Sequence, residues 1–168
     1  MKMFNEVKGQ ISAELILLMG FLIIISVLSI VFVSYENELN IAILAAREGV
    51  NDGLFVNGLA IYPDVTYNDY INNKQILLHP NDIHLVKIDY KENGYDYTRN
   101  KIKIQFKVYV SSQTIKDKEI QNSAGDRINY NLRKSLAISF NTSSMSNTLF
   151  NPVYSKNYIF TTANVVWL

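Results

Sequence analysis

The chain has 168 residues, no cysteine, and sixteen Lys and Arg against fifteen Asp and Glu residues. This length allows one globular domain beside a membrane-length segment. The lack of cysteine excludes disulfides, thiolate metal sites and cysteine nucleophiles, and the balanced charge gives no electrostatic reason to expect nucleic acid as a partner.

The longest apolar run lies near the N-terminus, from Leu15 to Val33, and only three small residues interrupt it: Gly20, Ser26 and Ser29. As an α-helix this run would span about 28 Å at ~1.5 Å per residue, close to the ~30 Å hydrocarbon thickness of a bilayer. Lys2 and Lys8 precede the run, and basic residues mark the cytoplasmic end of a membrane helix. We therefore predict a membrane-spanning segment over 11–33, oriented by these two lysines.

Glu14 lies directly before the apolar run. A carboxylate at the edge of a membrane segment is costly without a partner, and such residues are functional by default. The simplest alternative is an ordinary signal anchor that holds Glu14 at the level of the lipid headgroups. We interpret Glu14 as a functional residue that needs a partner.

The stretch Lys-Gly-Gln-Ile-Ser-Ala-Glu, residues 8–14, resembles the class III signal peptides of archaeal prepilins. Their pattern is a short basic leader, then Gln-x-Ser-x-Glu, then a long hydrophobic helix. The resemblance implies that a prepilin peptidase cuts between Gly9 and Gln10, which removes the basic leader 1–9 and keeps the helix. Glu14 is then the fifth residue of the mature chain, where type IV pilins in general carry a glutamate.

The new α-ammonium group of Gln10 could pair with Glu14 of the same chain or of a neighbour in a filament. Such a pair would help to set the axial register of the stacked helices, which is the best-attested use of a buried ion pair. A simple membrane tether needs neither Gln10 nor Glu14. These two residues therefore distinguish the two functional hypotheses below.

The resemblance implies a structural subunit, a major or minor pilin, of an archaeal type IV pilus-like surface filament. Its expected partners are the prepilin peptidase, like or related pilin subunits, and the pilus assembly machinery in the membrane. The precursor would lie in the cell membrane and the mature protein in an extracellular filament, where adhesion, DNA uptake or secretion are possible tasks. The alternative is a single-pass membrane-anchored module whose extracytoplasmic head binds a ligand.

The helix is predicted to continue beyond the apolar run. No proline or glycine interrupts the next residues, and apolar side chains then recur at helical spacing: Leu39, Ile43, Ala46, Val50 and Leu54. We predict one helix from about Ile11 to about Leu59, ended by the Gly58 region and Pro63. Its amphipathic half, 34–60, would be the spine of a β-rich head, 61–168. Three glycines would each weaken the helix by about 1 kcal/mol relative to alanine: Gly49, Gly53 and Gly58. They either allow a sheet or a neighbouring helix to approach closely or mark a point where the helix frays earlier, and we favour close packing.

The head begins with a loop-like stretch, 62–80, and then shows strand signals. Residues 101–110 alternate strictly between apolar and mostly charged side chains, as a half-buried strand requires. Residues 83–90 are its predicted antiparallel partner. A turn at Asn93-Gly94 is one possible connection, but a longer loop reaching Arg99 brings the apolar side chains of 83–90 inward, and we favour it. Those side chains are Val86, Ile88 and Tyr90.

The remainder is expected to supply an exposed connection over 111–127 and a second strand region over 128–140. The apolar residues of this second region share one parity: Ile128, Tyr130, Leu132, Leu136, Ile138 and Phe140. A Ser/Thr/Asn-rich loop over 141–152 and closing strands at 158–161 and 164–168 follow, with Trp167 as a core anchor. The expected fold class is α+β, with a long N-terminal helix and an antiparallel head sheet of about four strands.

No sequence pattern indicates catalysis, so an enzyme is not expected and no cofactor is implied. The two histidines, His79 and His84, lack metal-ligand spacing. Residues 89–96 loosely resemble a calcium loop but lack its spacing, so we interpret them as a turn. The only glycosylation sequon, at Asn141, lies in the predicted 141–152 loop and is a possible modification site.

Overall fold

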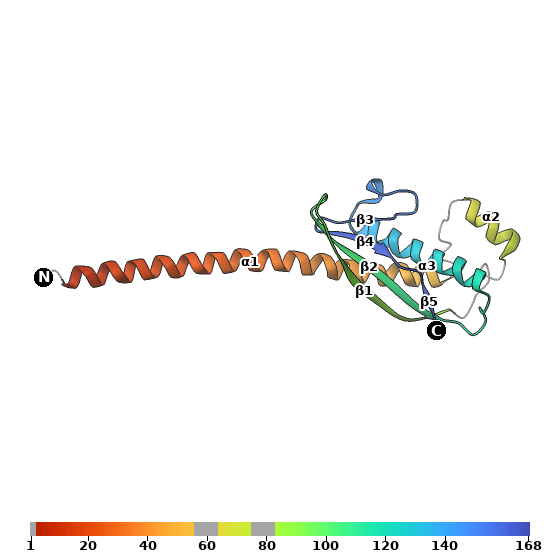
Figure 1. Cartoon of the computed structure of the whole chain (residues 1–168), viewed down its shortest axis with the longest axis horizontal. Helices are drawn as coiled ribbons and strands as arrows, with labels where there is room; N and C mark the ends of the chain where they lie inside the picture. Colours follow the sequence, from red (N-terminus) through yellow and green to blue (C-terminus); the bar gives the residue numbers. More distant parts are fainter. Residues whose placement is uncertain (1–2, 56–63, 75–82) are drawn as a thin grey trace. The chain divides into compact units, whose positions relative to one another are not determined.

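The protein was analysed as a computed structural model that describes residues 3–55, 64–74 and 83–168 (Figure 1). The chain divides into two compact units, Met1–Leu39 and Asn40–Leu168, and the division falls inside the first helix. The elements in chain order are α1 (Met3–Leu54), α2 (Asp64–Asn73), β1 (His84–Asp96), β2 (Lys101–Ser111), α3 (Lys118–Ser139), the 3-10 helix η2 (Ser143–Met145), β3 (Val153–Tyr154), β4 (Tyr158–Thr162) and β5 (Val166–Trp167).

The α+β fold class is confirmed, since a long apolar N-terminal helix precedes a sheet. Helix α1 starts at Met3, before the predicted start near Ile11, so the helix includes residues 3–9 of the leader. Extending an existing helix avoids the cost of nucleation, which explains the difference. The helix ends at Leu54, where the Phe55 N–H donates to the Asn51 carbonyl (3.2 Å). The predicted end near Gly58 lies outside the described residues.

In the second unit, the C-terminal part of α1 packs closely against α3. This part of α1 buries small residues: Ala42, Ala45, Ala46, Gly49 and Gly53. A Cβ on Gly49 would lie 2.7 Å from the Cα of Leu132, and one on Gly53 would lie 2.7 Å from the Cα of Ile128. The close-packing interpretation of these two glycines is therefore confirmed, with a helix as the neighbour.

Helix α3 replaces both the predicted connection and the second predicted strand, so those two predictions are wrong. Four residues spaced by four are fully buried along it: Ala124, Ile128, Leu132 and Leu136. Residues spaced by four also share parity, so a helical face mimicked strand alternation here. Ile138 continues the parity but is 62% exposed, as helical geometry requires. The Asp117 carboxylate caps the helix by accepting from the N–H groups of Glu119 (2.8 Å) and Ile120 (3.1 Å).

The sheet has five strands and is mixed, which corrects the expected antiparallel sheet of about four strands. Its order is β1-β2-β4-β3, with β5 also pairing with β2. Strand β2 is antiparallel to β1 but parallel to β4 and β5. In Figure 1, α3 (cyan) lies against β3 and β4 (blue). These three elements and β2 enclose the core. The predicted alternation of β2 is confirmed, because four inward residues are at most 3% exposed: Ile104, Phe106, Val108 and Val110.

The β1–β2 hairpin follows the longer connection that we favoured. Strand β1 continues to Asp96, and the turn occupies residues 97–100. Ile88 pairs with Val108 and Tyr90 with Phe106, so both lie on the face of β2 that is buried, as predicted, although Tyr90 remains 48% exposed. Val86 does not, because a register shift between Leu85 and Lys87 leaves it 50% exposed. The Asn93-Gly94 pair lies at a second register shift, with Gly94 at φ 81°.

Residues 64–73 form helix α2, although this stretch was predicted to be a loop. The helix has little apolar periodicity, so its pattern does not distinguish it from a loop. Polar pairs within and beside it supply local support. The Asn73 side chain donates to Asp69 Oδ1 (2.8 Å), and Lys74 Nζ donates to Asp69 Oδ2 (2.7 Å). Lys74 also lies 3.6 Å from Glu119 of α3.

Candidate functional site: the apolar segment of α1

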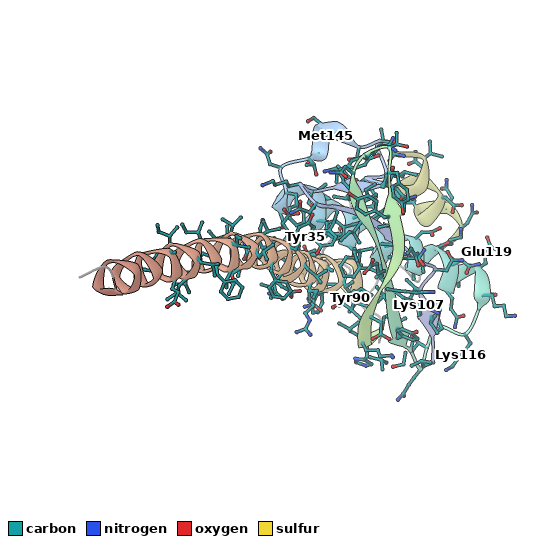
Figure 2. All side chains as sticks on the ribbon, turned by 60° about the vertical axis from the view of Figure 1, so that its left-hand side comes forward. Tyr35, Tyr90, Lys107, Lys116, Glu119 and Met145 are labelled. Atoms are coloured by element: carbon teal, nitrogen blue, oxygen red, sulfur yellow. The ribbon has the colours of Figure 1, made fainter. Side chains whose placement is uncertain are left out.

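The apolar segment of α1, residues 13–33, is exposed along its whole length within the chain. Side chains project on all sides of this part of the ribbon (Figure 2). Its large apolar residues are between 43% and 75% exposed, from Ile25 at the lower limit to Leu17 at the upper. An exposed apolar surface of this extent is typical of a membrane segment or of an interface with other proteins.

The two serine hydroxyls of this segment are satisfied within the helix. The hydroxyl of Ser26 donates to the Leu22 carbonyl (2.8 Å), and that of Ser29 donates to the Ile25 carbonyl (2.8 Å). These bonds matter because an unsatisfied polar group in hydrocarbon costs several kcal/mol. A Cβ on Gly20 would meet nothing within 4 Å, so no intrachain contact requires a glycine there. By length and composition α1 could cross a membrane, a property that N-terminal signal sequences share.

The predicted processing and assembly residues all lie in or before this helix. Glu14 is exposed, one residue before the apolar run. Lys8, Gly9 and Gln10 belong to the helical backbone of α1, so the Gly9–Gln10 bond lies inside an α-helix. Lys2 lies outside the described residues. The arrangement thus brings the Gly9–Gln10 bond and Glu14 into the first turns of one continuous element.

Asn141 is exposed and lies directly after α3, in the loop that was predicted for it. Its φ of 52° is left-handed, and its N–H donates to the Ile138 carbonyl (3.0 Å) while the Thr142 N–H donates to the Ala137 carbonyl (2.8 Å). This pair of bonds is a Schellman cap, in which Asn is the usual alternative to Gly. Asn141 therefore has a structural reason to be asparagine, beside its accessible sequon.

No group of three or more His, Cys, Asp or Glu side chains that could hold a metal exists among the described residues. The suspected calcium loop falls in β1 instead, where Asp89 accepts from Lys87 (2.6 Å). Asp96 starts the hairpin turn by accepting from the N–H groups of Thr98 (3.0 Å) and Arg99 (3.1 Å). The bond from Arg99 N–H, followed by the charge of Lys103 and the bond from Thr98, lowers the pKa of Asp96 despite some desolvation. His84 is exposed at the start of β1, and His79 lies outside the described residues.

A pocket beside α3, which we call the α3 pocket, was not predicted from the sequence. Its lining residues come from α3, from the segment between β4 and β5, and from β5 itself: Gln121, Asn122, Gly125, Asp126, Asn129, Asn164, Val165 and Trp167. Trp167, expected to be a core anchor, is only half-buried and forms part of the wall. Burial raises the pKa of Asp126, and the charges of Arg133 and Lys74 act against this shift. The pocket was not predicted because residues 121–129 were not recognised as part of a helix.

Comparison of the chain with protein-family models, curated proteins and solved structures finds no match.

Proposed function

We propose that this chain is a subunit of a type IV pilus-like surface filament of the archaeal kind, polymerised through the apolar segment of α1. The observation that carries the proposal is the difference in burial between the two parts of α1. Residues 40–54 of α1 are packed into the head by small side chains, whereas residues 13–33 leave their entire apolar surface exposed. A segment of this kind can lie in lipid first and against the same segment of other subunits later.

The N-terminal residues supply the second support for this proposal. Glu14 stands at the beginning of the apolar run, where a purely anchoring helix gains nothing from a carboxylate. Cleavage before Gln10 would create an α-ammonium group on the same helix, about one turn before Glu14. An ion pair between neighbouring subunits would offset the cost of burying Glu14 and would favour one axial register.

Processing at the Gly9–Gln10 bond requires local opening of α1, because the bond lies in helical backbone. The helix end is the place where opening costs least, since terminal turns fray with free energies near zero. The peptidase would therefore meet the bond in a locally unwound state. A bulky apolar residue in place of Gln10 should block this cleavage.

The test is the N-terminal residue of the native protein in material sheared from the cell surface, determined by mass spectrometry. A mature chain that starts at Gln10 in a polymeric fraction is the expected result. A chain that keeps Met1 and stays in the membrane fraction would refute the proposal and favour the membrane-anchored binding module. Replacement of Gln10 by leucine provides the matched control, because its product should accumulate uncut in the membrane.

A further inference from the structure

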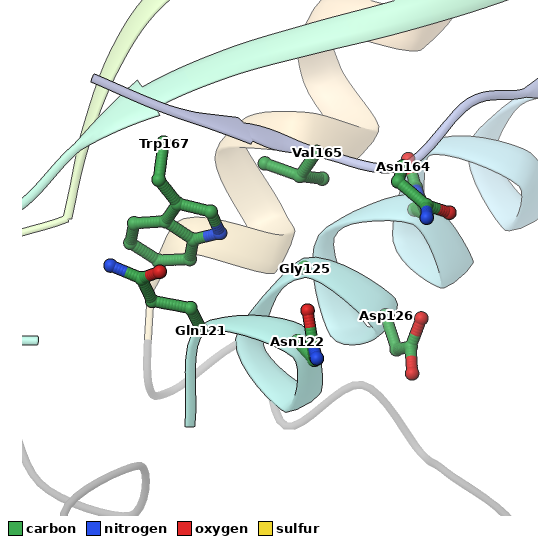
Figure 3. A pocket seen from close by; sticks show the side chains of 8 residues that line it. Gln121, Asn122, Gly125, Asp126, Asn164, Val165 and Trp167 are labelled. Carbon is green, nitrogen blue, oxygen red and sulfur yellow. The ribbon is translucent and has the colours of Figure 1, made fainter. Parts of the chain in front are cut away.

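The α3 pocket lies entirely in the second unit and has a volume of about 280 Å³ (Figure 3). It depends on a close approach of the β4–β5 segment to α3. A Cβ on Gly125 would lie 3.2 Å from the Cβ of Val165, so the glycine leaves room for this segment. The volume lies just below the ~300–1,000 Å³ of typical ligand pockets, which indicates a ligand of one small ring.

A buried amide points to a missing hydrogen-bond partner in the pocket wall. Asn129 is 6% exposed, and its side-chain nitrogen donates to the Ala163 carbonyl (2.9 Å). That bond fixes the amide orientation and leaves Oδ1 as the acceptor, which has no partner among the described residues. Leaving a buried acceptor unpaired costs stability.

The other polar groups face one another across the pocket. Figure 3 shows Trp167 and Gln121 on one side and Asn164 and Asp126 on the other, with Asn122 between them on α3. The Gln121 amide is held in place by its bond to the Ile115 carbonyl (3.1 Å). The lining therefore combines amide donors, amide and carboxylate acceptors, and one aromatic face.

This chemistry excludes several ligand classes. No Lys or Arg lines the pocket, and Asp126 would repel an anion, so a phosphate or carboxylate ligand does not fit. One carboxylate is too few for Ca²⁺, which takes six to eight oxygen ligands, mostly charged. A purely apolar ligand would leave the amides without partners. A neutral molecule with many hydroxyl groups satisfies donors and acceptors together.

We propose that the α3 pocket binds one neutral sugar unit, with an apolar ring face on Trp167 and hydroxyl groups bonded to Asn164 and Asp126. Tryptophan suits this role because it offers a large flat apolar face beside a polar N–H group. The sugar could be free or could be the terminal unit of a surface glycan, since the recognised chemistry is the same. The inference does not depend on polymerisation of α1, because every lining residue belongs to the second unit.

Trp167 is the only tryptophan of the chain, so its fluorescence reports directly on the pocket. The full chain, held in the sugar-free detergent lauryldimethylamine oxide, would be titrated with neutral hexoses and N-acetylhexosamines. We expect at least one of them to change the emission saturably, with a Kd of about 0.1–10 mM. Methyl glycosides of the same sugars form a second arm. If they bind as well as the free sugar, the ligand is a glycan end, and if they do not, it is the free sugar.

Asn164→Ala should raise the Kd roughly three- to tenfold through loss of one hydrogen bond, and Asn164 is exposed, so the fold should survive. Asn72→Ala, an exposed asparagine on α2, is the matched control and should leave the Kd unchanged. The proposal is overturned if no neutral sugar gives a saturable change, or if Asn164→Ala binds as tightly as the wild type. It is also overturned if only Ca²⁺ or the diamine putrescine, added as cationic probes, changes the emission.

Discussion

The close contact between α1 and α3 makes Gly49 the position where one added methyl group should do most harm. In Gly49→Ala the new Cβ would lie 2.7 Å from Leu132 Cα and 2.8 Å from Ser135 Cβ, and would collide with the Asn131 carbonyl oxygen. Two of these three atoms belong to backbone of α3, which cannot rotate away as a flexible side chain could. The two helices must therefore move apart.

The size of the effect follows from two opposing contributions. Alanine is favoured over glycine inside a helix by about 1 kcal/mol. Overpacking a core costs about 1–3 kcal/mol, and the upper part of this range applies because Val50 and Leu132, both fully buried, lose contact when the helices separate. We expect a net loss of about 1–2 kcal/mol, which corresponds to a fall in Tm of roughly 4–8 °C for a head of this size.

The assay is thermal unfolding followed by Trp167 fluorescence, which monitors the head without a contribution from the apolar segment of α1. Gly20→Ala is the matched control, because a Cβ there meets nothing within 4 Å, and its Tm should equal that of the wild type. Gly53→Ala should fall between the two, since only Ile128 Cα comes closer than 3.0 Å. A Gly49→Ala protein that melts at or above the wild-type temperature would refute the reasoning.

Three further predictions concern carboxylates. Glu14→Ala should insert into membranes as well as the wild type or better, yet give few sheared filaments, and a normal filament yield would contradict the assembly role of Glu14. Asp117→Ala should lower the free energy of unfolding by about 1 kcal/mol by removing the cap of α3, whereas Asp117→Asn should keep most of it; equal losses in denaturant titrations would argue against the cap. Because its pKa is lowered in the folded state, Asp96 stabilises the fold above about pH 4 and loses this effect as the pH falls through the lowered pKa. The Tm of the wild type should therefore drop more steeply in acid than that of Asp96→Asn, and parallel pH profiles would count against the turn contacts.

The elements that could be predicted are those whose pattern has a single physical reading. The apolar run before Val33 is too long for a strand and too uniform for an amphipathic helix. The alternation in β2 is not compatible with a helix, because Lys103 would then lie on the same face as buried Phe106, three residues later. In both places the residue spacing alone determines the element.

The elements that could not be predicted have residue patterns that fit a helix and a strand equally well, or that fit neither. Ile128, Leu132 and Leu136 are spaced by four, which fits a helix face and one side of a strand equally well. These residues form a helix because of tertiary contacts, above all those with Gly49 and Gly53 of α1, which local spacing does not reveal. The parallel pairing of β2 with β4 involves no local turn that the sequence could reveal. The α3 pocket combines Asn129 and Trp167, which are separated in the sequence by β3 and β4.

The central place of β2 in the sheet has a consequence for the order in which the head can fold. The β1–β2 hairpin is local and can form as soon as both strands exist, whereas Ile102 finds its β4 partner Tyr158 only much later in the chain. Until then one edge of β2 offers unpaired N–H and C=O groups, which is a template for pairing with another chain. Non-local pairing is also slow. A head that is made or exported N-terminus first therefore passes through an aggregation-prone stage, and chains cut short before Tyr158 would never leave it.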